Sequence, residues 1–389
     1  EDAKQMINIL LTELLCYLLF LLFVYIEDPV MVAAFIALMI IAGYMLQKTG
    51  RNFLQEIEKV YAENLGKVGL LAAAIALTVP FAIMGDSYWL QILNFMMLNA
   101  IMALGLNFMT GRAGLICLGY AAFMAIGAYT VGILTLKVGI SFWIALPLAG
   151  IFASLFGVIL GLPALRVKGH YLALVTIAFG LIVQELLLNL ESITGGTNGL
   201  IDIPSPRFFG IDMGTTVNFG FMSMTYQANF YYLCLALLII ATVVLYRFSN
   251  SLFGLALNAM REDQLAAQCY GLNLTNYKLL AFATGAFFGG TAGGVYAAMI
   301  NFIAPENFGY SLSIIVISMI ILGGLDSIPG ALVGAFFLTV FPEKFRAFED
   351  YRVMFYGIII VLCLLFMREG VLPFKHRIFK PKTAGGEEN

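Results

Sequence analysis

Charge is the most conspicuous shortage in this sequence. Asp, Glu, Lys and Arg together make up 11% of the 389 residues, whereas a soluble domain carries about 25% charged residues. Apolar residues reach 61%, more than a soluble core of this length requires. Lipid must therefore be the solvent for much of the chain, which predicts a polytopic membrane protein. The net charge of −2 comes without a basic stripe, so we expect no nucleic-acid partner.

Residues that carry chemistry are also few. The two histidines, His170 and His376, lie far apart in the sequence, which argues against a metal site. The five cysteines show no CxxC spacing, and four lie in or beside apolar runs, as core-filling thiols do. The sequence contains no P-loop, HExxH or EF-hand motif. We therefore expect a chain that is no enzyme and binds no cofactor, so that energy for active transport would enter through another subunit.

Long apolar runs are abundant instead, and a membrane-spanning helix needs about 20 such residues. The two shortest runs, 311–322 and 329–341, are nearer the length of re-entrant or broken helices. The sequence predicts an all-α polytopic fold with about 10–12 membrane segments, including short or broken helices. The 12 runs are 9–26, 29–46, 68–84, 90–110, 116–136, 142–160, 171–190, 230–246, 279–300, 311–322, 329–341 and 354–367.

The first two runs are predicted to form a hydrophobic hairpin ahead of the main body. We expect the run 9–26 to be a retained span, because no basic stretch typical of a signal peptide precedes it. The chain then divides into an N-terminal hairpin with a cytoplasmic linker (1–67), a main transmembrane domain (68–370) and a cytoplasmic tail (371–389).

Lys and Arg predict the orientation. With both termini in the cytoplasm, 16 of the 21 basic residues fall on the inner side, as the positive-inside rule requires. The loop 247–278 is then cytoplasmic, and the Gly- and Pro-containing loop 191–229 is external. The loop 343–352 is unusually charged for an external loop. A re-entrant segment near 311–341 would place either that loop or the C-terminal tail on the other side.

The loop 247–278 has a helical pattern. Apolar and small residues recur at steps of three and four between Leu252 and Tyr270, which predicts one amphipathic helix along the membrane face. Gly271 is suited to end this helix, because glycine tolerates the left-handed conformation of a C-cap. From the pattern alone, an ordinary interfacial helix is as well supported as a docking helix. The residues expected on its wet side are Arg261, Glu262 and Asp263.

Glycines interrupt or line several other runs. Three of them, in GRAGLICLG (111–119), break one long apolar stretch, and a broken helix can present backbone groups to a polar solute. Glu185 is a carboxylate inside an apolar run, a functional hypothesis by default, although it lies close to the expected outer interface. Glycine rows at 285, 289, 293 and at 330, 334 favour close helix packing within the chain. Candidate residues for a translocation path are Gly114, Cys117, Gly119, Tyr120 and Glu185.

Four stretches carry a family resemblance: GRAGLICLGYAAFMAIGAYTVGIL (111–134), residues 166–200 ending in TGGTNGL, residues 251–297 containing REDQLAAQCYG, and GGLDSIPGALVGA (323–335). In this order and spacing they resemble the LivM-type permeases of branched-chain amino acid ABC transporters, over most of the chain from about 68 to 367. Such permeases carry an EAA-like cytoplasmic motif that docks into an ATPase. Leu265 stands where that motif has Glu. The resemblance implies that the coupling helix contains Arg261, Glu262, Asp263, Ala266, Ala267 and Gly271, with the two alanines as a smooth docking face.

The resemblance also implies partners and a location. We expect a second permease of the LivH type, two ATPase subunits that carry ATP and Mg²⁺, an external solute-binding protein, and the bacterial cytoplasmic (inner) membrane. The binding protein would dock on the external loop, although that loop could equally fold against the bundle. The residues involved would be Thr194, Gly195, Gly196, Asn198 and Gly199.

More than one solute and more than one class of protein are compatible with the sequence. Leucine, isoleucine and valine are the expected solutes, but Cys117 and Tyr120 stand where relatives commonly have Ser and His. A permease for urea or short amides therefore stays open. A stand-alone carrier driven by an ion gradient would need more intramembrane charge than this sequence offers. An intramembrane enzyme would need a catalytic set, which the sequence does not suggest.

Overall fold

The computed structural model describes residues 2–26, 31, 65–83, 86–165, 167, 170–208, 211–218 and 223–344, with 357, 361 and 370. Most of the predicted runs 29–46 and 354–367, and the whole tail 371–389, lie outside these residues. The larger helices, in chain order, are α1 (Asp2–Tyr25), α4 (Leu65–Ala82), α5 (Ser87–Asn107), α6 (Ala121–Leu136), α7 (Phe142–Ala164), α8 (His170–Asn189), α10 (Tyr226–Ser249), α11 (Leu252–Glu262), α13 (Leu274–Ile300), α14 (Tyr310–Gly323) and α15 (Ile328–Lys344).

The structure confirms an all-α polytopic membrane protein. Within the described part of the chain, six helical stretches are long and apolar enough to cross a membrane: α5 with the π-helical turn η1 (Phe108–Arg112), α7, α8, α10, α13, and α14 with the 3₁₀ turn η3 (Pro305–Phe308) before it. Shorter apolar helices lie within α1 and α4, and α6 is a third. The run 311–322 reaches spanning length because η3 extends it. The total number of segments in the whole chain stays a prediction.

Helices α5 and α13 form the centre of the bundle. Met97, Leu98, Ile101 and Met102 of α5 are fully buried, and α13 packs against α5, α6 and α7. The glycines of α13 make this possible, because a Cβ at position 293 would overlap a carbonyl oxygen of α6. The predicted packing of the glycine rows within the chain is confirmed.

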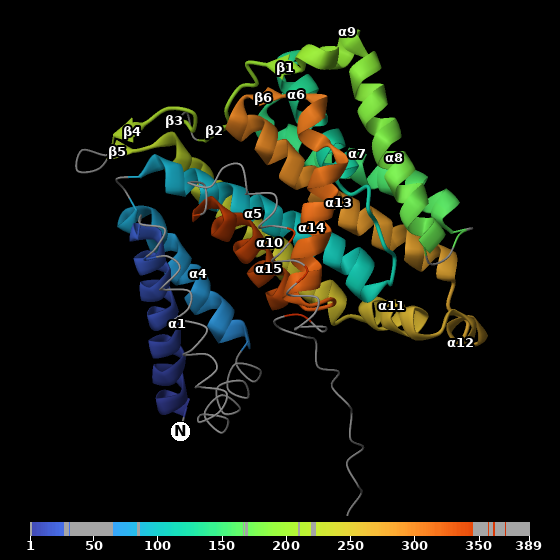
Figure 1. The fold of residues 1–389 in the computed structure, drawn as a ribbon, viewed down its shortest axis with the longest axis horizontal. Helices are drawn as coiled ribbons and strands as arrows, with labels where there is room; N and C mark the ends of the chain where they lie inside the picture. Colours follow the sequence, from blue (N-terminus) through green and yellow to red (C-terminus); the bar gives the residue numbers. More distant parts are fainter. Residues whose placement is uncertain are drawn as a thin grey trace, which may run out of the picture.

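The molecule has two distinct ends (Figure 1). At one end lie short antiparallel strand pairs and the helix α9 (Glu191–Thr194); β1 (Leu200–Ile201) pairs there with β6 (Phe302–Ile303). At the opposite end lie α11 and the short helix α12 (Gln264–Cys269). We call these the strand end and the α11–α12 end. The other strand pairs are β2 (Arg207–Phe208) with β3 (Ile211–Asp212), and β4 (Val217–Asn218) with β5 (Ser223–Met224).

Helices α14 and α15 form a tight hairpin. A Cβ added at Gly334 would overlap the Met319 carbonyl oxygen, and one at Gly323 would overlap the Gly330 carbonyl oxygen. The two backbones are thus in direct contact, as small residues allow between membrane helices. The connection between them, residues 324–327, is called the apex segment below, and it lies towards the α11–α12 end.

The N-terminal helix is attached to this hairpin and to α4. Lys344, the last residue of α15, donates from Nζ to the carbonyl oxygens of Val24 at 2.8 Å and Ile26 at 2.7 Å. A cation at a helix C-terminus is favourable because it meets the unpaired carbonyls there. The Tyr25 hydroxyl donates to the Ala82 carbonyl at 2.8 Å. Helices α1 and α4 accordingly lie side by side at one edge of the bundle (Figure 1).

Candidate functional site

The predicted amphipathic helix over 252–270 is wrong in one respect, because the structure contains two helices there. Asp263 separates α11 from α12 with an extended backbone, φ −149° and ψ 111°. Its Oδ1 accepts from the backbone N–H groups of Leu265 at 2.8 Å and Ala266 at 3.1 Å. Aspartate is a favoured N-cap because it satisfies amides that the helix leaves unpaired. Asp263 therefore starts a new helix and is more than a solvated charge.

Gly271 ends α12 as predicted. Its φ of +83° is left-handed, its N–H donates to the Gln268 carbonyl at 2.9 Å, and the Leu272 N–H donates to the Ala267 carbonyl at 3.1 Å. This pair of bonds is the Schellman motif, which favours glycine at the position after the cap. The chain is thereby turned back towards α13.

The surface of α12 differs from the expected face of two alanines. Ala267 is only 4% exposed and packs into the molecule, whereas Ala266 is exposed. Leu265 is 71% exposed and Tyr270 is 88% exposed. The face presented at this end therefore consists of Leu265, Ala266 and Tyr270, which we call the projecting face.

Arg261 also departs from the expected wet position. Its side chain is 34% exposed and turns towards the body, where Nη1 donates to the Gly111 carbonyl and lies 3.8 Å from Oδ2 of Asp326. Arg112 lies on the other side of the same carboxylate, with Nε 2.6 Å from Oδ1. Asp326 is 3% exposed, and a buried carboxylate is tolerated only when paired. The three side chains form a buried ionic cluster that joins α11, η1 and the apex segment.

Asn107 adds neutral hydrogen bonds to this junction. Its Oδ1 accepts from the Asp326 N–H at 2.9 Å, and its Nδ2 donates to the Ser327 carbonyl at 3.0 Å. Gly111 leaves no room for a side chain, because a Cβ would overlap Asp326. The end of α5 and its π-helical turn are therefore fitted closely to the apex segment, although Asp326 lies 219 residues after Asn107 in the sequence.

The predicted helix break in GRAGLICLG is confirmed. Residues 113–120 lie between η1 and α6 without helical structure. The Leu118 N–H donates to Thr176 Oγ1 of α8 at 3.0 Å, and the Ala121 N–H donates to Ser313 Oγ of α14 at 2.9 Å. Side chains thus supply partners that a helix would otherwise supply, as buried backbone polar groups require.

Three of the candidate path residues, Cys117, Gly119 and Tyr120, lie close together in the interior, whereas Gly114 and Glu185 are exposed. Cys117 and Tyr120 are 0% exposed, and the Tyr120 hydroxyl donates to the Gly285 carbonyl of α13 at 2.7 Å. Gly119 is buried directly against α8. Gly114 is exposed, with φ +67°, and lies beside the Arg261 side chain. Glu185 is exposed on the outer face of α8. Lining of a path by these five residues stays a prediction.

The TGGTNGL loop folds against the bundle. The buried Thr194 hydroxyl donates to the carbonyl of Leu187 at 2.6 Å and to that of Leu190 at 2.8 Å. Gly195 and Gly196 are left-handed, and so is Gly199, which is pressed against Ile303 of β6. Of the five docking candidates, Asn198 is the exposed one. The loop geometry is explained by packing, and docking of a binding protein stays a prediction.

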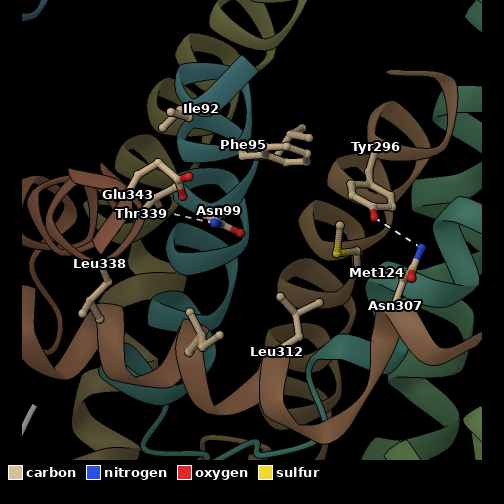
Figure 2. A pocket seen from close by; sticks show the side chains of 12 residues that line it. Ile92, Phe95, Asn99, Met124, Tyr296, Asn307, Leu312, Leu338, Thr339 and Glu343 are labelled. Carbon is tan, nitrogen blue, oxygen red and sulfur yellow. Dashed lines mark hydrogen bonds between the residues drawn. The ribbon is translucent and has the colours of Figure 1, made fainter. Parts of the chain in front are cut away.

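A pocket that the sequence reasoning missed opens between α5, α6, α13, η3, α14 and α15 (Figure 2). Its volume is about 260 Å³. The Asn99 amide donates to Thr339 Oγ1 at 3.1 Å, and the Asn307 amide donates to the Tyr296 hydroxyl at 3.4 Å. The sequence signal was an amide inside the apolar run 90–110, which a search for ionisable residues alone passes over. No group of three His, Cys, Asp or Glu side chains suited to a metal is found among the described residues.

Helices of spanning length, a helix break between η1 and α6 and a helix pair projecting at one end make this a polytopic α-helical membrane protein. The family profile "Branched-chain amino acid transport system / permease component" matches residues 88–364. The chain belongs to this permease family.

Individual relatives agree with the profile. The chain is 37% identical over 332 residues to the high-affinity branched-chain amino acid transport system permease protein LivM of Escherichia coli K12. The aligned region covers 82% of this chain and 78% of that protein. LivM of Salmonella typhimurium is likewise 37% identical, with 84% and 79% covered. The permease protein LivH of Salmonella typhimurium is 28% identical over 298 residues, with 74% and 92% covered. No solved structure gives a significant match.

Proposed function

We propose that this chain is the membrane-spanning permease subunit of an ATP-driven importer for leucine, isoleucine and valine. It would work with a second permease of the LivH type, two ATPase subunits that bind ATP and Mg²⁺, and an external solute-binding protein. Its location would be the bacterial cytoplasmic membrane, with both termini in the cytoplasm. The names of the LivM and LivH relatives support the solute and the pairing of permeases.

The anchoring of the α11–α12 pair supports a role in coupling an ATPase subunit to the membrane domain. Its projecting face of Leu265, Ala266 and Tyr270 offers an apolar surface with one small residue. Its base is tied to the membrane domain through Arg261 and Asp326. An ATPase subunit that closes on ATP and pushes on the projecting face would therefore move the apex segment as well. An ordinary interfacial helix has no need of such an anchor.

The first test is purification of the chain from its native membrane in mild detergent, followed by mass spectrometry of the attached proteins. We expect a second permease and two P-loop ATPase subunits. Recovery of the chain alone, under conditions that preserve other ABC complexes, would favour a carrier driven by an ion gradient. Uptake of radiolabelled leucine and of urea by the same membranes then separates the amino-acid importer from a permease for short amides.

A charge on the projecting face tests the coupling assignment. Ala266→Glu adds a carboxylate to an exposed position, so we expect a folded, membrane-inserted protein that no longer supports ATP-driven uptake. Val138→Glu adds the same charge at an exposed position in the short connection between α6 and α7 and should leave uptake unchanged. Normal uptake by the Ala266→Glu variant would mean that α12 does not contact the ATPase.

A further inference from the structure

The pocket of Figure 2 lies in the half of the bundle nearer the strand end. Its residues come from the first part and the middle of α5, the last turns of α13 and α15, and the first turns of α14. Met124, near the start of α6, is the lining residue next to the broken segment 113–120. The cavity therefore extends from the strand end to the level at which the helix α6 begins.

Polar groups stand on two opposite sides of this pocket (Figure 2). On one side, Asn99 and Thr339 form their hydrogen bond beside Glu343, whose carboxylate accepts from the Tyr88 hydroxyl. On the other side, Asn307 and Tyr296 form the second bond. One wall thus offers a carboxylate and an amide oxygen, and the facing wall offers an amide and a phenol as donors.

The remaining lining is apolar and uncharged. Phe95 forms an aromatic pair with Tyr296, with ring centroids 6.2 Å apart. Lys344, the cation next in sequence to Glu343, bonds to the end of α1. A volume of about 260 Å³ is just below the roughly 300–1,000 Å³ typical of sites for drug-sized ligands, which indicates a small solute. The aliphatic residues that complete the lining are Ile92, Leu98, Leu312, Ile315 and Leu338.

We propose that this pocket binds the transported solute on its way through the chain and that it fits a zwitterionic amino acid with an aliphatic side chain. The proposal rests on the function proposed above and adds the site. The solute's ammonium group would face Glu343 and the Asn99 carbonyl oxygen, because a carboxylate and an amide oxygen accept from a cation. Its carboxylate would face the Asn307 amide and the Tyr296 hydroxyl, and its aliphatic side chain would contact the lining leucines and isoleucines.

Thiol protection tests occupancy directly. Thr339→Cys, at a lining position with no assigned contact to the solute, is introduced into the full importer, with its binding protein, in a background in which Cys16, Cys117, Cys234, Cys269 and Cys363 are alanine. We expect a water-soluble maleimide to label Cys at position 339 and saturating leucine to slow that labelling at least several-fold. A Thr215→Cys control, on an exposed loop outside the pocket, should be labelled at the same rate with and without leucine.

A charge-removing variant in the natural background provides a second readout. Glu343→Gln should lower leucine uptake at least about tenfold, because one hydrogen bond to a charged group contributes about 1.5–3 kcal/mol and about 1.4 kcal/mol is a factor of ten. Glu306→Gln is the matched control, since Glu306 is exposed on η3 and does not line the pocket. Its uptake should equal that of the unmodified importer.

The outcomes separate the site from the function. If the unmodified complex shows no ATP-driven leucine uptake, the proposed function fails. If uptake is normal in the unmodified complex, but leucine gives position 339 no protection and Glu343→Gln transports at the full rate, the function stands and the pocket is not the solute site. Protection at position 339 together with a selective loss in Glu343→Gln supports the site.

Discussion

Replacing Asp326 by Asn should destabilise the protein more than any comparable change of a surface charge. Asn keeps the size of the side chain and also tolerates the left-handed backbone of this residue, whose φ is +68°. The substitution therefore removes the charge without adding backbone strain. It leaves two guanidinium groups, Arg112 and Arg261, facing each other without their shared carboxylate.

The magnitude follows from the burial of the pair. The side chains of Asp326 and Arg112 are 3% and 8% exposed, and removing one partner of a buried pair costs about 3–5 kcal/mol. Arg207 and Asp212 provide the contrast, because their side chains are 79% and 39% exposed and their closest atoms are 3.9 Å apart. An exposed pair contributes about 0–1 kcal/mol, so Arg207→Gln should change little.

The assay is the thermal unfolding midpoint of the purified importer in detergent, with uptake measured on the same variants. We expect a midpoint lowered by several degrees for Asp326→Asn and an unchanged one for Arg207→Gln. Combining Asp326→Asn with Arg112→Gln should be less damaging than the sum of the two changes, because residues in contact are not additive. Equal midpoints for Asp326→Asn and Arg207→Gln, or full additivity in the double variant, would refute the buried cluster as a source of stability.

Three further outcomes are expected. Gly293→Ala should lower the free energy of unfolding by at least about 3 kcal/mol or prevent assembly, because its Cβ would overlap the α6 backbone. Gly69→Ala is the control: a Cβ there has nothing within 4 Å, so this variant should be neutral or slightly stabilising in the same unfolding assay. Gly199→Ala should loosen the β1–β6 contact, because its φ is +69° and its Cβ would meet Ile303, and hydrogen exchange at β1 should speed up. Glu185→Gln should alter uptake only modestly, since this carboxylate is exposed on α8. Complete loss of uptake would instead support an ion-coupled mechanism.

Features set by local chemistry could be read from the sequence. Long apolar runs mark helices because a backbone in lipid must satisfy its own hydrogen bonds, and α7 and α13 lie where the runs 142–160 and 279–300 predict them. Gly271 ends its helix because a left-handed C-cap needs glycine. The helix break in 111–119 follows from the same property of glycine.

Features set by tertiary neighbours could not be read in this way. Arg261 has the appearance of a solvated charge until Asp326, 65 residues further on, is placed beside it. In a membrane, apolarity does not tell the inside from the outside: α8 is more apolar than α5, yet far less of it is buried. For the same reason Glu185 could not be assigned to the interior or the surface. The pocket could not be predicted either, because its residues come from six elements that are separated in the sequence.

The contact between the backbones of α14 and α15 has a mechanical consequence. In the half of the hairpin nearer the apex, Gly323, Gly330 and Gly334 leave no layer of side chains that could slide or repack between the two helices. The hairpin therefore turns as one rod about 20 Å long, since 14 helical residues rise about 1.5 Å each. Its apex is held by Arg261, and its other end carries Leu312, Ile315 and Thr339 of the pocket wall. We therefore expect a tilt imposed at the ionic cluster to change the width of the cavity.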